Sequence, residues 1–343
     1  MTLRIAINGY GRIGRCFLRA LHESPLRDRL AVVAINEPAD LDSMAYLTRF
    51  DSTHGRFSGM VECTSDGLVI NGQRIHVTHE RKPDAVPWGE LGIDLLVECS
   101  GRYSHRVELE QFLAAGCPRL LLSHPGHSAA DVDRTIVFGY NDATLIGNER
   151  LVSAASCTTN ATIPVLALLH EHFGIEQTLL TTLHSAMNDQ PLIDGYHHSD
   201  ARRNRSAMQS LIPVTTGLAR GVERLLPALT GRVVAKSVRV PVANVSAIDL
   251  VATLARPATA DAINALLRRT ASADFSGVLA CSDEAHASID FNHSPFSAIV
   301  DTTQTRLVGD RLLNLLIWFD NEWGFTNRML DLTTAWLGRA AGK

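Results

Sequence analysis

Residues 3–14 read LRIAINGYGRIG, an apolar strand that runs directly into three spaced glycines. A helix follows, because the next apolar residues recur at spacings of three and four. A second apolar strand, residues 30–35, ends in Asn36 and Glu37. Strand, glycine turn, helix and second strand in this order predict a dinucleotide-binding βαβ unit.

Each glycine has its own role in such a unit. Gly9 makes the tight turn, Gly11 lets the backbone approach a diphosphate, and Gly14 lets helix and strand pack closely. The diphosphate would rest on the amino terminus of the helix. The cofactor-binding residues predicted in this stretch are Asn8, Gly9, Gly11, Arg12, Ile13 and Gly14.

Glu37 follows the second strand at the position where an acid selects the cofactor. We expect its carboxylate to accept hydrogen bonds from the adenosine ribose hydroxyls and to repel a 2′-phosphate. NAD is therefore favoured over NADP. The alternative is a solvated acid at a strand end.

The alternation of strands and helices continues to about residue 155 and predicts a doubly wound, mostly parallel sheet. A hairpin with an Asn71-Gly72 turn of type I′ is expected within it. Beyond residue 156 the elements are longer and typical of an α+β domain with a largely antiparallel sheet. The expected strand-rich stretches there are residues 177–185, 232–254, 286–290 and 305–319, and the expected helices are residues 213–229 and 259–271.

Composition excludes several classes of protein. The chain has 343 residues, enough for two domains, and its net charge of −4 gives no pull toward nucleic acid. No apolar run reaches the ~18 residues of a membrane span, and the amino terminus enters a strand without a signal peptide. The six cysteines are scattered, which predicts neither a zinc site nor disulfides and favours the cytoplasm. We expect no metal, no nucleic acid and no membrane partner.

Residues 153–160 read SAASCTTN and lie between an apolar strand and a helical run. Cys157 should therefore stand at or just before the first turn of a helix, where the helix dipole favours a thiolate. We expect its thiol to ionise more readily than that of a free cysteine. The alternative is a buried packing cysteine.

His184 ends a short apolar strand that begins near Leu179. One strand–helix–strand excursion separates it from Cys157, enough to bring the two side chains to neighbouring strand ends. An imidazole near a thiol can take its proton and return one, so the pair predicts nucleophilic catalysis. A structural histidine is the alternative.

These motifs resemble the phosphorylating glyceraldehyde-3-phosphate dehydrogenase superfamily over nearly the whole chain. The resemblance rests on INGYGRIGR at residues 7–15, SCTTN at residues 156–160, His184-Ser185, NDQ at residues 188–190 and DNEWGF at residues 320–325. It implies a discontinuous NAD-binding Rossmann domain, residues 1–156 with 320–343, and a catalytic domain, residues 157–319.

The resemblance also implies site residues. Cys157 and His184 would be catalytic. Two arginines suit a substrate phosphate, because a guanidinium binds phosphate with two hydrogen bonds and Arg239 is a charge inside an apolar strand. For the basic cluster at residues 202–205 a solvated surface or inter-subunit ion pairs are alternatives. The further cofactor residues are Arg81, Ser123 and Asn321, and the substrate residues are Ser156, Thr158, Arg203, Thr216, Gly217 and Arg239.

Residues 189–211 are polar and without periodicity. Their length favours a linker. The resemblance instead implies a loop that lines the cofactor site of a neighbouring subunit, and hence a homotetramer.

The implied reaction is oxidation of a phosphorylated aldose through a thioester on Cys157. In the superfamily either phosphate or water breaks that thioester. Several positions here depart from the phosphorylating pattern and resemble the erythrose-4-phosphate dehydrogenases, which use water and form 4-phospho-D-erythronate for pyridoxal 5′-phosphate synthesis. These positions are Glu37, His124-Pro125-Gly126, Ala186-Met187, Leu218-Ala219-Arg220 and residues 290–293. A phosphorylating glyceraldehyde-3-phosphate dehydrogenase is the alternative, and a non-catalytic NAD- or RNA-binding protein is an alternative of another class.

Overall fold

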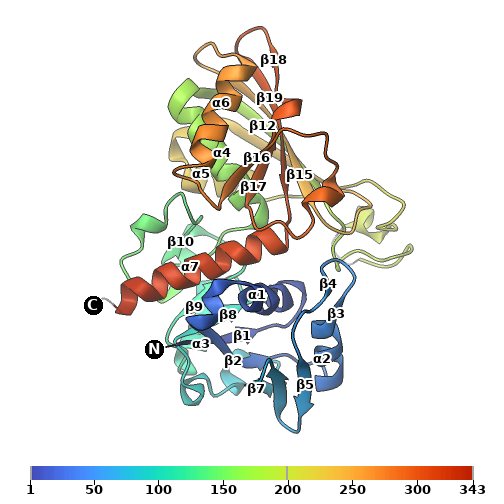
Figure 1. Cartoon of the computed structure of the whole chain (residues 1–343), viewed down its shortest axis with the longest axis vertical. Helices are drawn as coiled ribbons and strands as arrows, with labels where there is room; N and C mark the ends of the chain where they lie inside the picture. Colours follow the sequence, from blue (N-terminus) through green and yellow to red (C-terminus); the bar gives the residue numbers. More distant parts are fainter. Residues whose placement is uncertain (1, 198–199, 342–343) are drawn as a thin grey trace. The chain divides into compact units, whose positions relative to one another are not determined.

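The computed structural model describes residues 2–197 and 200–341, and the side chains of all of these except residue 341. The chain divides into two compact units (Figure 1). The first comprises residues 1–156 and 326–343, and the second residues 157–325. The predicted cofactor domain includes residues 1, 342 and 343, which lie outside the described residues.

The described part of the first unit is built on a nine-stranded sheet in the order β10-β11-β9-β8-β1-β2-β7-β6-β5. Neighbouring strands from β10 to β7 pair in parallel, and only β6 and β5 are antiparallel. The bounds are β1 (Leu3–Asn8), β2 (Leu30–Asn36), β5 (Val61–Thr64), β6 (Gly67–Ile70), β7 (Gln73–Thr78), β8 (Leu95–Glu98), β9 (Leu120–Leu122), β10 (Arg134–Thr135) and β11 (Leu151–Ser153).

The helices of this unit pack on the sheet through apolar faces. Helix α1 (Arg12–Glu23) buries Cys16, Phe17, Ala20 and Leu21, the spacing that predicted it. The other helices in the first 156 residues are α2 (Leu41–Arg49) and α3 (Arg106–Ala114). A small antiparallel ribbon pairs β3 (Phe50–Asp51) with β4 (Gly55–Arg56).

The predicted hairpin turn is confirmed. Asn71 and Gly72 have φ values of 50° and 81°, and they join β6 to β7 with Ile70 paired to Gln73. Positive φ at both central residues defines the type I′ turn, whose twist matches the flanking strands.

The second unit contains a mixed, largely antiparallel sheet in the order β13-β14-β12-β15-β19-β17-β16, with β18 paired to β19. Figure 1 shows its helices together on one side of this sheet. The strands are β12 (Ile175–His184), β13 (Ile212–Val214), β14 (Val233–Arg239), β15 (Ser246–Leu254), β16 (Leu279–Ser282), β17 (Ala298–Asp301), β18 (Arg306–Val308) and β19 (Leu312–Phe319), and the helices are α4 (Cys157–Phe173), α5 (Leu218–Leu225) and α6 (Ala260–Ala271). The predicted fold class is confirmed in both units.

Two predicted elements of this unit were wrong. The helix expected over residues 213–229 is α5 followed by a 3₁₀ turn, Pro227–Leu229. Its predicted start was wrong because Pro213 belongs to the edge strand β13, where the missing N–H of proline breaks no hydrogen bond of the sheet. The strand expected over residues 286–290 is a 3₁₀ turn, Ser288–Phe291, closed by Asp290, which accepts a hydrogen bond from the N–H of Ala287 at 2.8 Å.

Helix α7 (Trp323–Ala341) carries the chain back into the first unit, which resumes at Thr326 rather than at residue 320. Asp320 stays with the second unit because its carboxylate accepts hydrogen bonds from Asn244 and from the N–H of His293, each at 2.8 Å.

No helix in the described part of the chain combines the length and apolar character that crossing a bilayer requires.

Candidate functional site

A pocket of about 160 Å³ opens at the carboxyl ends of the parallel strands of the first unit. Five predicted cofactor residues meet there: Asn8, Gly9, Gly11, Glu37 and Arg81. The remaining lining residues are Asn36, Pro38, Glu80, Lys82, Cys99, Ser100, Arg102 and Tyr103. The carboxyl edge of a parallel sheet is where α/β proteins bind nucleotides.

The glycines fit the roles that the sequence predicts. A Cβ atom on Gly9 would lie 2.6 Å from the N atom of Ser100, and one on Gly14 would lie 2.3 Å from the carbonyl oxygen of Gly9. Gly9 also has a φ of 86°, which other residues rarely adopt. Gly11 has no neighbour within 4 Å of such an atom, so its backbone is open to a ligand. The turn is therefore shaped for close backbone contact with a diphosphate.

Glu37 is held at the rim of this pocket by backbone donors. Its carboxylate accepts hydrogen bonds from the N–H of Tyr10 at 2.7 Å and of Ala39 at 3.3 Å. The acid therefore keeps its place beside the glycine turn, where it suits a ribose diol and opposes a 2′-phosphate.

A network of buried polar side chains, which the sequence did not predict, lies at the ends of the strands beside the pocket. Four neighbouring strands, β7, β2, β1 and β8, each end in a polar residue, and each of these residues is paired with the one on the next strand. In this order they are Thr78, Asn36, Asn8 and Glu98. Thr78 donates to Asn36, Asn36 to Asn8 at 2.7 Å, and Asn8 to Glu98. Polar residues at the ends of apolar strands were the only signal in the sequence.

Glu98 is fully buried at the end of this network and also accepts hydrogen bonds from the N–H and hydroxyl of Ser100. Burial raises the pKa of its carboxyl group to about 7, against the opposing effect of these donors. Asn8 and Ser100 both line the pocket, so Glu98 fixes two of its walls.

The other predicted cofactor residues lie outside this pocket. Arg12 opens α1, but its guanidinium turns to the carboxylate of Asp51. Ile13 and Gly14 continue the same helix, and Ser123 follows β9. None of these side chains is among the pocket's lining residues.

The reactive stretch forms the predicted strand–turn–helix. Ser153 ends β11, and its hydroxyl accepts a hydrogen bond from the N–H of Ala155 at 3.0 Å. Ala155 has a φ of 60°, an unusual conformation for a residue with a Cβ. This sharp turn places Cys157 as the first residue of α4.

His184 ends β12, and its Nε2 atom lies 3.9 Å from Sγ of Cys157. The imidazole is 7% exposed and packs edge-on against Phe319, with ring centroids 6.5 Å apart. Its Nδ1 atom lies 2.9 Å from the carbonyl oxygen of Ser185. The structure thus brings together the two predicted catalytic side chains.

Ionisation of the thiol differs from the prediction. Burial raises the pKa of Cys157 to about 11, although the N–H of Thr158 and the charge of Arg239 oppose this rise. Burial, with Arg239 second, lowers the pKa of His184 to about 4. The expectation of an acidic thiol was wrong because desolvation of the sulfur outweighs the helix terminus. Near neutral pH the pair is a thiol and a neutral imidazole.

Arg239 is the register partner of His184 on the neighbouring parallel strand β14. Its Nη1 atom lies 2.6 Å from Nδ1 of His184 and 3.5 Å from the carbonyl oxygen of Ser185. Burial lowers the pKa of this guanidinium, with the charges of Asp189 and Cys157 opposing and that of Arg203 adding to the effect. An anion beside Arg239 would therefore relieve a partly buried cation.

Arg203 contributes a second cation to the same surroundings. Its guanidinium donates to Asp189 at 2.8 Å from a short 3₁₀ turn, Ala201–Asn204. Thr216 and Gly217 precede α5, where the hydroxyl of Thr216 accepts the N–H of Leu218 at 3.2 Å. Ser156 and Thr158 flank the thiol in sequence.

Asn321 holds the end of β12 from within the second unit. Its Oδ1 atom accepts hydrogen bonds from the hydroxyls of Ser185 at 2.9 Å and Ser246 at 2.7 Å. Ser246 in turn accepts the N–H of Ser185 at 3.1 Å. These bonds hold Ser185, whose carbonyl faces His184, through its N–H and hydroxyl. The sequence did not indicate this positioning role.

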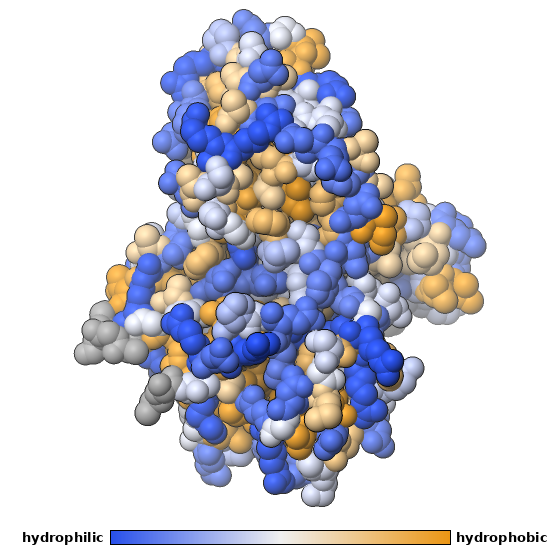
Figure 2. Space-filling model, viewed as in Figure 1, coloured by the Kyte–Doolittle hydropathy of each residue, from blue (hydrophilic) through white to orange (hydrophobic). Residues whose placement is uncertain are grey.

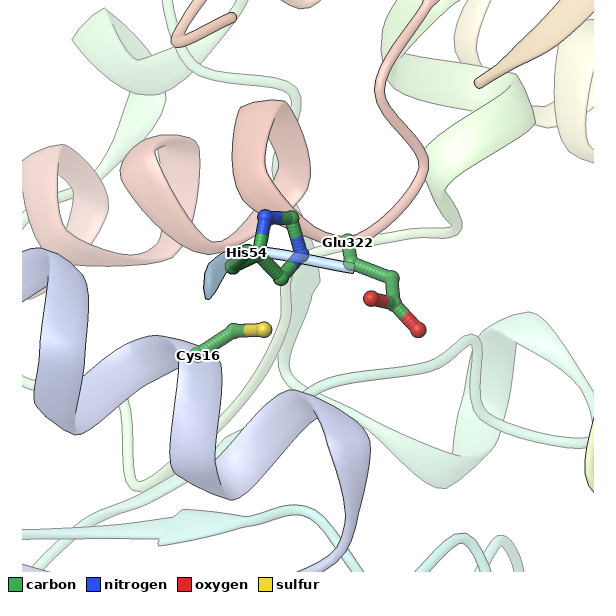
Figure 3. Close-up of side chains that lie close together, drawn as sticks. All are labelled: Cys16, His54 and Glu322. Atoms are coloured by element: carbon green, nitrogen blue, oxygen red, sulfur yellow. The ribbon is translucent and has the colours of Figure 1, made fainter. Parts of the chain in front are cut away.

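Figure 3 labels two possible metal ligands of the first unit, the Cys16 thiol on α1 and the His54 imidazole in the β3–β4 turn. The third labelled residue, Glu322, belongs to the second unit. One thiol and one imidazole are fewer ligands than a zinc site requires, so the first unit alone forms no such centre from these groups.

Family models match both units. One, described as the NAD binding domain of glyceraldehyde 3-phosphate dehydrogenase, matches residues 3–106. Another, described as the C-terminal domain of glyceraldehyde 3-phosphate dehydrogenase, matches residues 156–321. The chain belongs to the glyceraldehyde-3-phosphate dehydrogenase superfamily.

Membership of this superfamily confirms the predicted class of enzyme and the predicted cofactor. The protein has the domains of an NAD-dependent oxidoreductase, and NAD is its cofactor. The residues around the first pocket fit this dinucleotide, since an open glycine turn and a fixed acid are the groups that it requires.

Proposed function

We propose that this superfamily member oxidises D-erythrose 4-phosphate to 4-phospho-D-erythronate, with water breaking the acyl intermediate. The observation that carries the proposal is Met187. Its side chain is 44% exposed three residues after His184, where the phosphorylating relatives have a threonine hydroxyl for the substrate phosphate. A thioether cannot donate a hydrogen bond to phosphate, so Met187 could not hold a substrate phosphate as the threonine of the phosphorylating pattern would.

Cys157 forms the bond to the substrate. Nε2 of His184 receives the Sγ proton, and the sulfur adds to the aldehyde carbon. The backbone N–H of Cys157 donates to the resulting oxyanion at the start of α4. Bound NAD supplies the hydride acceptor for oxidation at this carbon. The imidazolium of His184 returns its proton to the oxyanion, which gives the hydroxyl of a thiohemiacetal. His184 removes this hydroxyl proton again as the carbon is oxidised, which leaves a thioester on Cys157, and it then releases the proton to solvent.

Water completes the reaction. Neutral His184 takes a proton from a water molecule, whose oxygen attacks the thioester carbon as the C–S bond breaks. Aldehyde, water and NAD are thus converted to carboxylic acid, NADH and a proton, and the thiol is restored. The low pKa of His184, about 4, keeps the imidazole available as a base at neutral pH.

Two arginines would hold the substrate phosphate. Arg239 lies beside His184, and the charge of Arg203, on the 3₁₀ turn Ala201–Asn204, acts on Arg239. Arg220 adds a third cation, since its Nη2 atom would lie 3.6 Å from a Cβ atom on Gly217. Ser156 and Thr158, which flank the thiol in sequence, would contact the sugar.

A homotetramer is part of the proposal. The described parts of the segment at residues 189–211, residues 189–197 and 200–211, are hydrogen-bonded to each other, since Ala207 donates to Pro191 at 3.0 Å and Ser206 to Leu192 at 2.7 Å. The segment nevertheless exposes apolar side chains, which Figure 2 shows in orange where the chain is yellow-green in Figure 1. These apolar side chains are Leu192, Ile193, Met208 and Leu211, and the segment also exposes the ring of Tyr196.

The sheet of the second unit supports the same conclusion. Its helices cover one face, and the other face exposes Leu179, Leu183, Val234 and Leu312. Exposed apolar side chains on a sheet face that no helix covers favour burial against another chain. We place the enzyme in the cytoplasm, where its product would feed pyridoxal 5′-phosphate synthesis.

Product analysis by ³¹P NMR tests the proposed chemistry. With erythrose 4-phosphate, NAD and inorganic phosphate present together, we expect a single phosphomonoester acid. A second phosphorus signal from an acyl phosphate would instead assign the phosphorylating reaction. No aldehyde-dependent NADH with either sugar phosphate would favour a non-catalytic binding protein.

A further inference from the structure

Nδ1 of His184 has two competing neighbours. The carbonyl oxygen of Ser185, at 2.9 Å, can only accept a hydrogen bond, whereas Nη1 of Arg239, at 2.6 Å, can only donate one. A neutral imidazole carries one ring proton, so Nδ1 can satisfy only one of these neighbours at a time. The neighbour that Nδ1 serves determines the state of Nε2, the atom that faces Cys157.

With Arg239 in place, Nδ1 accepts and the ring proton lies on Nε2. Arg239 also reaches the Ser185 carbonyl at 3.5 Å, so its guanidinium serves both acceptors. In this state Nε2 points an N–H at the sulfur and cannot take the thiol proton. Without Arg239, Nδ1–H donates to Ser185, and Nε2 presents a lone pair to Cys157.

We propose that the phosphate of the substrate switches the tautomer of His184 by drawing Arg239 away from Nδ1. The inference rests on the proposed function in one respect, that the substrate carries a phosphate which Arg239 binds. The base would thus be assembled only when a phosphorylated aldehyde is present, which protects the thiol in the resting enzyme.

The surroundings of the pair permit this movement. Arg239 is only partly buried, and no carboxylate among the described residues lies within ion-pair distance of it. By contrast, Ser185 is held through its N–H by Ser246 and through its hydroxyl by Asn321, and these two partners are themselves hydrogen-bonded to each other. The charged groups that act on His184 are Arg239, Asp189 and Glu322, and Cys157 faces its Nε2 atom. Of the groups around Nδ1, the arginine is therefore the movable one.

Alkylation of Cys157 by iodoacetamide, without NAD or aldehyde, tests the switch. Peptide mass spectrometry separates Cys157 from the other cysteines. Inorganic phosphate should accelerate alkylation of the wild-type protein at pH 7 by about tenfold, the size expected for loss of one charge-assisted hydrogen bond. Without phosphate, Cys157 of the Arg239→Ala variant should be alkylated faster than Cys157 of the wild type by a similar factor. Added phosphate should not change the rate of the variant.

Simple electrostatics predicts the opposite change in the alkylation rate of Cys157. Arg239 favours the thiolate by its charge, so its removal, or an added anion, would slow alkylation if no tautomer change occurred. Lys236→Ala removes an exposed cation from the same strand and should leave the wild-type behaviour unchanged. Each alkylation rate is divided by the limiting rate that the same protein reaches at alkaline pH. This ratio cancels differences in access of the reagent to the sulfur.

Arg239→Ala combined with His184→Asn should lose the acceleration, because the effect passes through the imidazole. An unchanged or slower normalised rate in either the phosphate arm or the Arg239→Ala arm overturns the switch. Since no aldehyde enters this assay, that result would leave erythrose 4-phosphate oxidation standing, and failure of the oxidation assay would leave the switch standing.

Discussion

Sγ of Cys157 lies 3.9 Å from Nε2 of His184, although the two residues are 27 positions apart in the chain. The first begins α4 and the second ends β12, so rigid elements hold both. Burial keeps the pair as thiol and neutral imidazole near neutral pH, with pKa values of about 11 and about 4. The site therefore needs proton transfer within the pair to make its nucleophile.

Replacing Cys157 by serine tests the nucleophile. A hydroxyl in this place is far harder to ionise, so the kcat of aldehyde-dependent NADH formation should fall on the order of a thousandfold or more. The cofactor pocket of the first unit is unchanged, so the Kd for NAD should match the wild type. Retention of more than about a tenth of the wild-type kcat would contradict the role of Cys157.

The pH dependence of stability tests the burial of His184. The unfolded chain protonates this imidazole near its ordinary pKa of 6.5, whereas the folded chain does so near 4. Between these values the unfolded state binds more protons, so stability is lost as the pH falls. This group should lower the free energy of unfolding by about 2 kcal/mol between pH 7.5 and pH 5.

Urea unfolding of the wild type and of His184→Asn at both pH values measures that contribution. The variant lacks the titrating group, so its free energy of unfolding should vary correspondingly less with pH. Equal pH dependence in the two proteins would show that His184 is not desolvated as described.

Glu98→Gln tests the network beneath the cofactor pocket. The carboxylate accepts hydrogen bonds from Asn8 and Ser100, and an amide would turn an NH₂ group toward one of these donors. We expect the Kd for NAD to rise about tenfold, with kcat at saturating NAD nearly unchanged. Glu90→Gln, at an exposed acid of the same unit, is the matched control. Equal affinity in both variants would assign Glu98 no part in the pocket.

Glu37→Ser tests the choice of cofactor. Removing the carboxylate removes both a ribose partner and the charge that opposes a 2′-phosphate. The ratio of kcat/KM for NADP to that for NAD should rise by roughly a hundredfold. An unchanged ratio would mean that another group sets cofactor preference.

Local sequence patterns predicted the fold because each element of the first unit carries its own signal. The glycine motif, the spacing of Cys16, Phe17 and Ala20, and the Asn71-Gly72 turn each determine structure within a few residues. The same local reasoning failed at Pro213, where the edge position of β13 is a property of the whole sheet.

Cys157 and His184 were predictable as a pair, but the contacts that tune them were not. Arg239 meets His184 because β12 and β14 pair in parallel with these two residues in register, which no spacing in the chain reveals. The Asn8–Glu98 contact arises in the same way between β1 and β8. The acidity of the thiol was mispredicted because burial, unlike a helix start, cannot be read from neighbouring residues.

Initial rates of NADH formation test the central claim most directly. Erythrose 4-phosphate and glyceraldehyde 3-phosphate are each assayed with and without inorganic phosphate. We expect the higher kcat/KM with the four-carbon aldehyde, at a rate that needs no phosphate. A strict requirement for phosphate together with preference for the three-carbon aldehyde would contradict the proposal and identify a phosphorylating glyceraldehyde-3-phosphate dehydrogenase.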